Sequence, residues 1–171
     1  SSWRPIQLQS GTLTGLNVKI HRIDGPNHVE WPEPRMIEGR STKRLQAVLD
    51  DSYSTGGQIL VFVNSRVSAQ KEARELSKHI RKQISNDPTK YDTELIDEWD
   101  NLAERSTRRE DTSVMGKSLA QAIRGGVAFH HAGLTHNQRK AVEEAFRQGT
   151  LLSIVATPTL AQGVNLPARR V

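Results

Sequence analysis

Three short runs of apolar residues most constrain the fold of this chain. They read "ILVFV" from Ile59, "VAFHH" from Val127 and "LLSIVA" from Leu151, and stretches with apolar residues at helical spacing separate them. A run that is apolar on both faces is typical of a central parallel strand, because helices cover both faces of a parallel sheet. The alternation predicts an α/β fold whose ligands bind at the carboxyl ends of the strands.

Helical spacing predicts how the segments between these runs are folded. A helix should follow the first run. The stretch 86–111 is highly charged yet has apolar residues at helical spacing, and a second helical period follows it, so we predict a helical insert at about 86–125. The second helix of this insert is expected around Leu119 to Arg124. The helix after the second run should begin with a capping box formed by Thr135 and Gln138.

The first part of the chain has a different character. Residues 1–34 alternate only weakly between apolar and polar positions and contain four prolines, which predicts an extended arm with a hairpin. The remainder, 35–171, is predicted to be the main domain. With 171 residues and 35% hydrophobic residues the chain supports one ordinary core, and two independent cores would each be marginal.

Composition narrows the classes of partner and compartment. Lys and Arg number 24 against 19 Asp and Glu, a net charge of +5 that is compatible with a polyanionic partner but is equally typical of a basic surface. The absence of cysteine excludes a disulfide framework and a thiolate zinc site. No apolar run is long enough to cross a membrane and no hydrophobic leader begins the chain, so we expect a soluble, intracellular protein.

Several apparent nucleotide or metal motifs do not satisfy their own requirements. "GKS" at 116–118 resembles the end of a P-loop, but the position of the required earlier glycine is Asp111 and no apolar strand precedes it, so a helix with an acidic N-cap region is the better interpretation. "DEWD" at 97–100 lies inside a helical period. His130, His131 and His136 could suggest a metal site. The first two are neighbours on a predicted strand and therefore point to opposite faces, and no set of carboxylates or thiols lies nearby in the sequence, so we expect no metal site.

Small and polar residues follow each of the three predicted strands, at 64–66, 132–135 and 157–159. Short side chains let a ligand approach the backbone closely, and hydroxyl and N–H groups bind phosphate without reading sequence. Each loop alone is weak support, since Ser and Thr often cap helices and Gly often forms turns. Their repetition along one sheet edge favours a nucleic-acid backbone as the ligand.

The same segments resemble a known family. "ILVFVNSR", "GVAFHHAGLTHNQRKAVEEAFRQG" and "VATPTLAQGVNLPARRV" resemble motifs IV, IVa and V of the second RecA-like domain of superfamily two helicases, in the Ski-like DExH branch. "SSWRPIQL" and the insert ending "RGGVAFHHAGL" most resemble the archaeal DNA repair helicases related to HelQ and to the helicase part of DNA polymerase theta. The resemblance implies a fragment of an ATP-dependent 3′ to 5′ DNA helicase of repair and recombination, cytoplasmic and nucleoid-associated if archaeal.

The resemblance also implies roles for individual positions. Those that match contacts to the single-strand backbone are Arg66, Gly133, Thr135 and Thr157. Arg139 takes the arginine position of motif IVa, although pairing with Glu143 one turn later is an alternative. Gly163 and Asn165 match positions at the ATP cleft between the two RecA-like domains.

The expected catalytic parts lie elsewhere. The chain has no complete P-loop, no acidic box on a strand, and no motif VI before Val171, so we expect no catalytic residue here and no hydrolysis by this part alone. The resemblance implies ATP and Mg²⁺ as cofactors of the whole enzyme, and single-stranded or forked DNA and the first RecA-like domain of the same chain as partners. Alternatives are an RNA helicase of the same branch and a non-catalytic nucleic-acid-binding α/β module.

Overall fold

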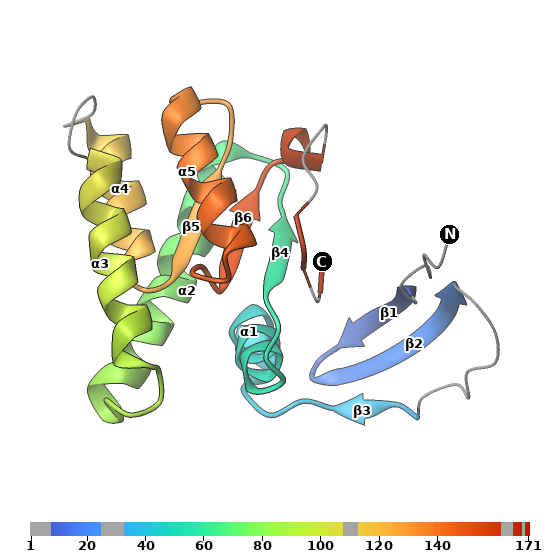
Figure 1. The fold of residues 1–171 in the computed structure, drawn as a ribbon. Coiled ribbons are helices and arrows are strands. Elements are labelled where there is room, and N and C mark those ends of the chain that lie inside the picture. The colour runs from blue at the N-terminus through green and yellow to red at the C-terminus, as the bar shows by residue number, and fades with distance from the viewer. Residues whose placement is uncertain (1–7, 25–32, 108–112, 162–165, 169) are drawn as a thin grey trace, which may run out of the picture. The chain divides into compact units, whose positions relative to one another are not determined.

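The structure is a computed structural model that describes residues 8–24, 33–107, 113–161, 166–168 and 170–171. Its contacts divide the chain into two compact units, Ser1–Asp51 and Ser52–Val171, and Figure 1 gives the labels of their elements. The division at residue 34 that the sequence predicts stays a prediction.

The first unit contains a small antiparallel sheet. Strand β1 (Leu8–Thr14) pairs with β2 (Asn17–Asp24), and β2 pairs in turn with the short β3 (Arg35–Met36). Gly15 has a φ of 60° in the tight turn between β1 and β2, a conformation that glycine adopts without steric cost. A hairpin was therefore predicted correctly within 1–34, whereas the third strand lies just beyond that segment.

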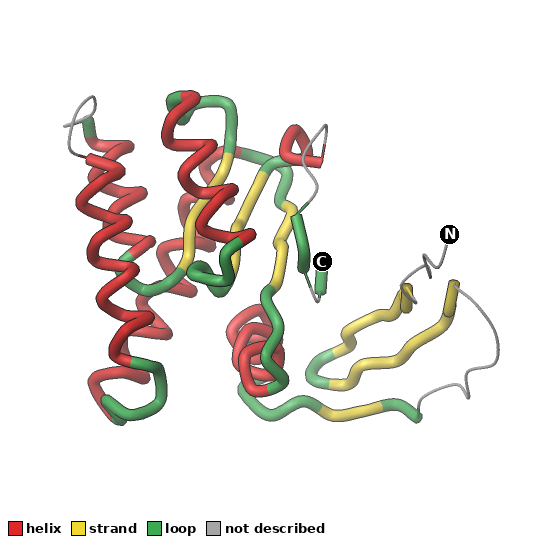
Figure 2. Tube along the Cα trace, in the orientation of Figure 1, coloured by secondary structure: helices red, strands yellow, loops and turns green. Residues whose placement is uncertain are grey.

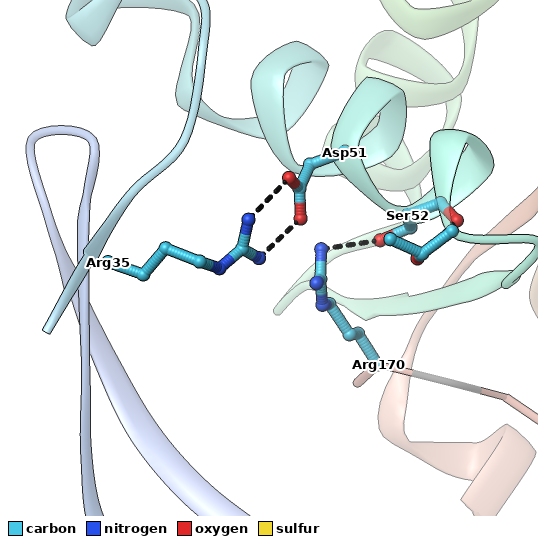
Figure 3. Close-up of polar contacts among 5 residues, drawn as sticks. Arg35, Asp51, Ser52 and Arg170 are labelled. Atoms are coloured by element: carbon cyan, nitrogen blue, oxygen red, sulfur yellow. Dashed lines mark hydrogen bonds and ion pairs between the residues drawn. The ribbon is translucent and has the colours of Figure 1, made fainter. Parts of the chain in front are cut away.

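Helix α1 (Arg44–Ser54) follows a single 3₁₀ turn, η1 (Ser41–Lys43). Both oxygens of the Asp51 carboxylate, on α1, accept hydrogen bonds from the guanidinium of Arg35 on β3, at 2.9 and 2.7 Å (Figure 3). This fork-to-fork geometry fixes orientation as well as distance, so it ties α1 to the small sheet of the first unit.

A parallel sheet forms the centre of the second unit. Its strands β4 (Ile59–Phe62), β6 (Ser153–Ala156) and β5 (Val127–His130) lie in that order and correspond to the three apolar runs. Arg170 adds an isolated parallel bridge to Ile59, and its guanidinium donates to the hydroxyl of Ser52 at 3.0 Å (Figure 3). The predicted α/β class with a parallel sheet is confirmed.

Helices cover both faces of this sheet. Helices α2 (Arg66–Asn86), α3 (Thr93–Thr107) and α4 (Val114–Ile123) connect β4 to β5, and α5 (His136–Arg147) connects β5 to β6. The two crossovers run in opposite directions along the sheet, so right-handed connections place their helices on opposite faces. Figure 2 shows α5 in front of the yellow strands and α2 behind them. Across the described ranges, no helix is long and apolar enough to span a bilayer.

Helix α3 is anchored by a fully buried tryptophan. The indole N–H of Trp99 donates to the carbonyl of Thr150 at 2.7 Å. Gly126, with a φ of 75°, lies against the ring, because a Cβ there would be 2.5 Å from an indole carbon. "DEWD" is thus part of a packed helix, as its periodicity predicts.

Helix α4 begins earlier than the sequence predicts and contains the "GKS" stretch. The hydroxyl of Ser113 caps the helix by accepting a hydrogen bond from the Gly116 N–H at 3.1 Å. The prediction of an acidic N-cap region was wrong, because a serine oxygen satisfies the first-turn N–H group. The interpretation of "GKS" as helical is confirmed.

Candidate nucleic-acid interface

The three predicted loops meet at the carboxyl edge of the parallel sheet. Phe62, Ala156 and His130 are paired across the sheet, so all three strands end at the same level. The ladder continues one step beyond them: the N–H of Val63 donates to Ala156 at 2.9 Å, and the N–H of Thr157 donates to His130 at 3.2 Å. The three loops that are predicted to bind a phosphate backbone therefore start side by side at this edge.

Two helices begin at this edge and direct their positive dipole ends toward it. The Ser65 hydroxyl caps α2 by accepting from the Ser68 N–H at 3.1 Å. Thr135 caps α5 in a complete capping box: its hydroxyl oxygen accepts from the Gln138 N–H at 3.1 Å, and the side-chain oxygen of Gln138 accepts from the Thr135 N–H at 2.9 Å. The predicted capping box is confirmed. Two helix N-termini at the same edge of the sheet make that edge electrostatically favourable for anions.

Gly133 and Arg66 lie close together at the interface. A Cβ built on Gly133 would be 3.5 Å from the nearest guanidinium nitrogen of Arg66, at the start of α2, and only 2.8 Å from Cε1 of His131. Glycine is therefore the residue that lets the loop after β5 approach both side chains. A cation beside a bare stretch of backbone suits a phosphate group.

His131 holds this loop in place. Its Nδ1 accepts a hydrogen bond from the Gly133 N–H at 3.0 Å, and its Nε2 lies 3.0 Å from the side-chain amide of Gln70 on α2. Its ring stacks on Phe129, with centroids 5.4 Å apart. Because Nδ1 accepts from the Gly133 N–H, it carries no proton in the neutral ring, and the atom of Gln70 that faces Nε2 is the side-chain amide nitrogen.

The electrostatics of the site keep this imidazole neutral. Burial lowers the pKa of His131 below its ordinary value, and the positive charge of Arg66 and the neighbouring His130 lower it further. A protonated ring would lose the hydrogen bond from Gly133, because both ring nitrogens would then be donors. The position of the loop is thereby linked to the protonation state of His131.

His130 points to the other face of the sheet, as adjacent strand residues do. Its Nε2 lies 3.4 Å from a carboxylate oxygen of Glu143 on α5, and the side chain is buried. Burial lowers the pKa of His130, while the Glu143 carboxylate acts in the opposite sense. The two histidines thus join the sheet to helices on its two faces. Within the described ranges, no cluster of three or more metal-binding side chains is found.

Arg139 stabilises the same loop from the first turns of α5. One of its guanidinium nitrogens donates to the carbonyl of Leu134 at 2.6 Å and to that of Ala132 at 3.3 Å. The alternative of pairing with Glu143 is not what the structure has, since the Glu143 carboxylate faces His130 instead. Arg139 therefore orders the carbonyls that flank Gly133.

Thr157 occupies the central position of the edge. It is half-buried, and its carbonyl accepts from the Leu160 N–H at 3.2 Å at the start of the 3₁₀ turn η2 (Pro158–Ala161). Gly163 and Asn165, the predicted ATP-cleft residues, lie outside the described residues. The roles of the four backbone-binding residues, of Arg139 and of these two remain predictions.

Sequence reasoning missed the function of His131. It set the histidine pair aside as an unconvincing metal site and did not consider that the second histidine could hold a loop. The available indication was a histidine just after a predicted strand and two residues before a glycine. Its partner Gln70 is 61 residues away in the chain, so no local pattern connects the two.

Comparison with known proteins adds an independent observation. The description "Helicase conserved C-terminal domain" belongs to the family whose model matches residues 105–171. Over its whole length the chain is 36% identical to proteins named "ATP-dependent DNA helicase Hel308" from Methanocella arvoryzae, Caldivirga maquilingensis and Pyrococcus horikoshii. The matched regions cover 21%, 20% and 20% of those proteins, so the chain spans about a fifth of the length of these relatives.

Proposed function

We propose, from the premise that this chain is the second RecA-like domain of a superfamily two helicase, that its parent is an ATP-dependent 3′ to 5′ DNA helicase of repair and recombination. In this proposal the carboxyl edge of the sheet holds the backbone of the strand along which the enzyme moves. The Gly163 and Asn165 region contributes one side of an ATP cleft shared with the first RecA-like domain.

One observation carries the proposal. The structure brings the guanidinium of Arg66, the bare backbone at Gly133 and the N-termini of two helices to one edge of a parallel sheet. The guanidinium and the helix N-termini favour a negatively charged group, the missing Cβ of Gly133 leaves room for it, and none of these features reads a base. A motor that moves along a strand needs such sequence-independent contacts, because it must release and rebind at every position.

The whole enzyme would use ATP together with Mg²⁺, and binding of ATP would close two RecA-like domains on each other. Single-stranded or forked DNA, inside the cell, is the proposed substrate. The relatives named above are described as DNA helicases, which favours DNA over RNA. RNA is the second candidate, since the backbone contacts proposed here do not by themselves tell the two apart.

Replacing Thr157 with valine in the full-length parent tests the proposed edge. Valine keeps the branching and nearly the volume of threonine but cannot donate a hydrogen bond. A hydrogen bond to a charged phosphate is worth roughly 1.5–3 kcal/mol, so affinity for single-stranded DNA should fall by about tenfold or more. DNA-stimulated ATP hydrolysis should fall with it, while ATP binding without DNA changes little.

Thr150→Val is the matched control, because Thr150 lies just before the other end of the same strand, where its hydroxyl bonds Glu98 at 3.0 Å. It should leave DNA affinity unchanged. A Thr157→Val protein that melts at a lower temperature but binds DNA normally would show that the threonine only supports its turn. Parallel titrations with single-stranded RNA decide between the two substrates.

A further inference from the structure

A second cluster of positive charge lies away from the carboxyl edge, in a pocket between α2 and α4. The pocket has a volume of about 350 Å³, and half of its lining residues are Lys or Arg, against 24 of 171 in the whole chain. These cations are Arg74, Lys78, Arg81 and Arg124. No carboxylate is among the lining residues of this described pocket, which instead adds the hydroxyl of Ser118 and the side-chain amide of Gln121.

The nearby acids neutralise this charge only loosely. Glu75 lies 3.7 Å from the ammonium of Lys78 and 4.0 Å from the guanidinium of Arg74, and Asp100 lies 3.8 Å from that of Arg124. The side chains of Arg74 and Lys78 are 54% and 64% exposed. Exposed pairs at such distances contribute little free energy, so the cations are available to another anion.

The floor of the pocket is rigid, because the two helices meet there at close range. The Ser77 hydroxyl on α2 donates to the carbonyl of Gln121 on α4 at 3.3 Å. A Cβ on Gly125, just after α4, would come within 2.6 Å of the Ser77 carbonyl oxygen. Glycine thus permits the close approach of the two helices beneath the basic side chains that line the pocket.

The pocket lies away from the site proposed to hold the DNA strand along which the enzyme moves, which we call the tracked strand. Helix α2 begins at Arg66 on the carboxyl edge, and Arg74 to Arg81 lie roughly 12–22 Å further along its axis at 1.5 Å per residue. Arg74, Lys78 and Arg81 have the i, i+4, i+7 spacing that places side chains along one stripe of a helix. The stripe leads away from the site that holds the tracked strand.

We infer that this pocket binds phosphate groups of DNA that lies outside the tracked strand. The inference rests on the proposed function. It extends that function from the tracked strand at the carboxyl edge of the sheet to a further arm of the DNA. Guanidinium groups that converge with hydroxyl and amide donors are matched to phosphate oxygens. The two sources of such phosphates at a fork are the duplex and the displaced strand.

The test uses Lys78→Gln/Arg81→Gln in the full-length parent, with Lys71→Gln/Lys82→Gln as its matched control. All four side chains are exposed on α2, and each pair removes the same charge, but only the first pair lines the pocket. Affinity is measured as a function of salt on a short single strand, a singly tailed duplex and a two-tailed fork. The slope of log K against log salt is negative, and each lost phosphate contact should reduce its magnitude by about 0.9.

On DNA that has an extra arm, we expect the magnitude of this slope to be smaller by about two for the pocket variant than for the unmodified enzyme. The pocket variant should bind the short single strand as the control does. Loss on the tailed duplex identifies the duplex as the source, and loss on the fork alone identifies the displaced strand. Equal behaviour of pocket variant and control on every DNA would overturn the inference, as would an equal loss on the short strand. If the unmodified enzyme binds no DNA, the proposed function itself fails.

Discussion

At the scale of single residues, the interface depends on a side chain that is not expected to touch the ligand. His131 receives the Gly133 N–H on one nitrogen and faces Gln70 with the other. The Gly133 N–H is therefore already bonded, and what Gly133 offers a phosphate is the absence of a Cβ beside Arg66. His131 is in this sense a positioning residue for the loop.

The protonation of His131 should make stability depend on pH. Its pKa is lowered in the folded chain, chiefly by burial and then by Arg66 and His130, so the unfolded chain binds the proton first. The stability it contributes is complete above pH 6.5, the ordinary value, and is lost as pH falls below 6.5 through the folded pKa. Melting temperatures measured across this range should show the loss.

Two substitutions separate this effect from that of His130, whose lowered pKa acts with the same sign. His131→Asn keeps an acceptor near Gly133 but cannot titrate, so its melting temperature should fall less steeply with acid. His131→Leu removes the acceptor of the Gly133 N–H at every pH, and because Gly133 is exposed and can bond water instead, the cost should be only about 0.5–1.5 kcal/mol. An Asn variant with the same acid sensitivity as the unmodified protein would contradict the role of His131.

At the scale of elements, the sequence could predict what local patterns encode. The three strands were found from their apolar runs, the Thr135–Gln138 capping box from its spacing, and the insert from periodicity around Trp99. The strand order β4-β6-β5 has no local signature, because pairing between distant segments determines it. The start of α4 was missed because Ser113, its cap, lies next to a polar stretch without periodicity.

The capping box gives a prediction at this scale. Thr135→Ala removes the oxygen that accepts the Gln138 N–H, which should lower the free energy of unfolding by about 0.5–2 kcal/mol. Thr135→Ser keeps that oxygen and should change stability by much less. Denaturant unfolding measures both, and DNA affinity of the folded variants is measured beside it. If Ser restores stability but not affinity, the methyl group or shape of Thr135 matters at the interface beyond its cap.

At the scale of the whole molecule, the sequence predicts the carboxyl edge of the sheet but not the basic pocket between α2 and α4. Arg66 and the loops at the edge follow strands, so a general rule for parallel sheets places them together. The pocket between α2 and α4 forms only when Ser77 and Gly125 bring two helices together. A net charge of +5 shows that cations are in excess but not where they converge.

The position of the "GKS" stretch within α4 also leads to a prediction about ATP hydrolysis. The N–H of Gly116, which a P-loop would offer to phosphate, is buried in α4 and bonded to the Ser113 hydroxyl. Lys117 is exposed on the same helix and follows no strand. We therefore expect this chain alone to release no phosphate from ATP above background, with or without DNA.

The Lys117→Ala variant of the parent should hydrolyse ATP at the unmodified rate. Loss of a true P-loop lysine would instead remove the contact to the β- and γ-phosphates. Steady-state phosphate release measures both, and an inactive Lys117→Ala enzyme that is still folded would overturn the assignment of this segment as a structural helix.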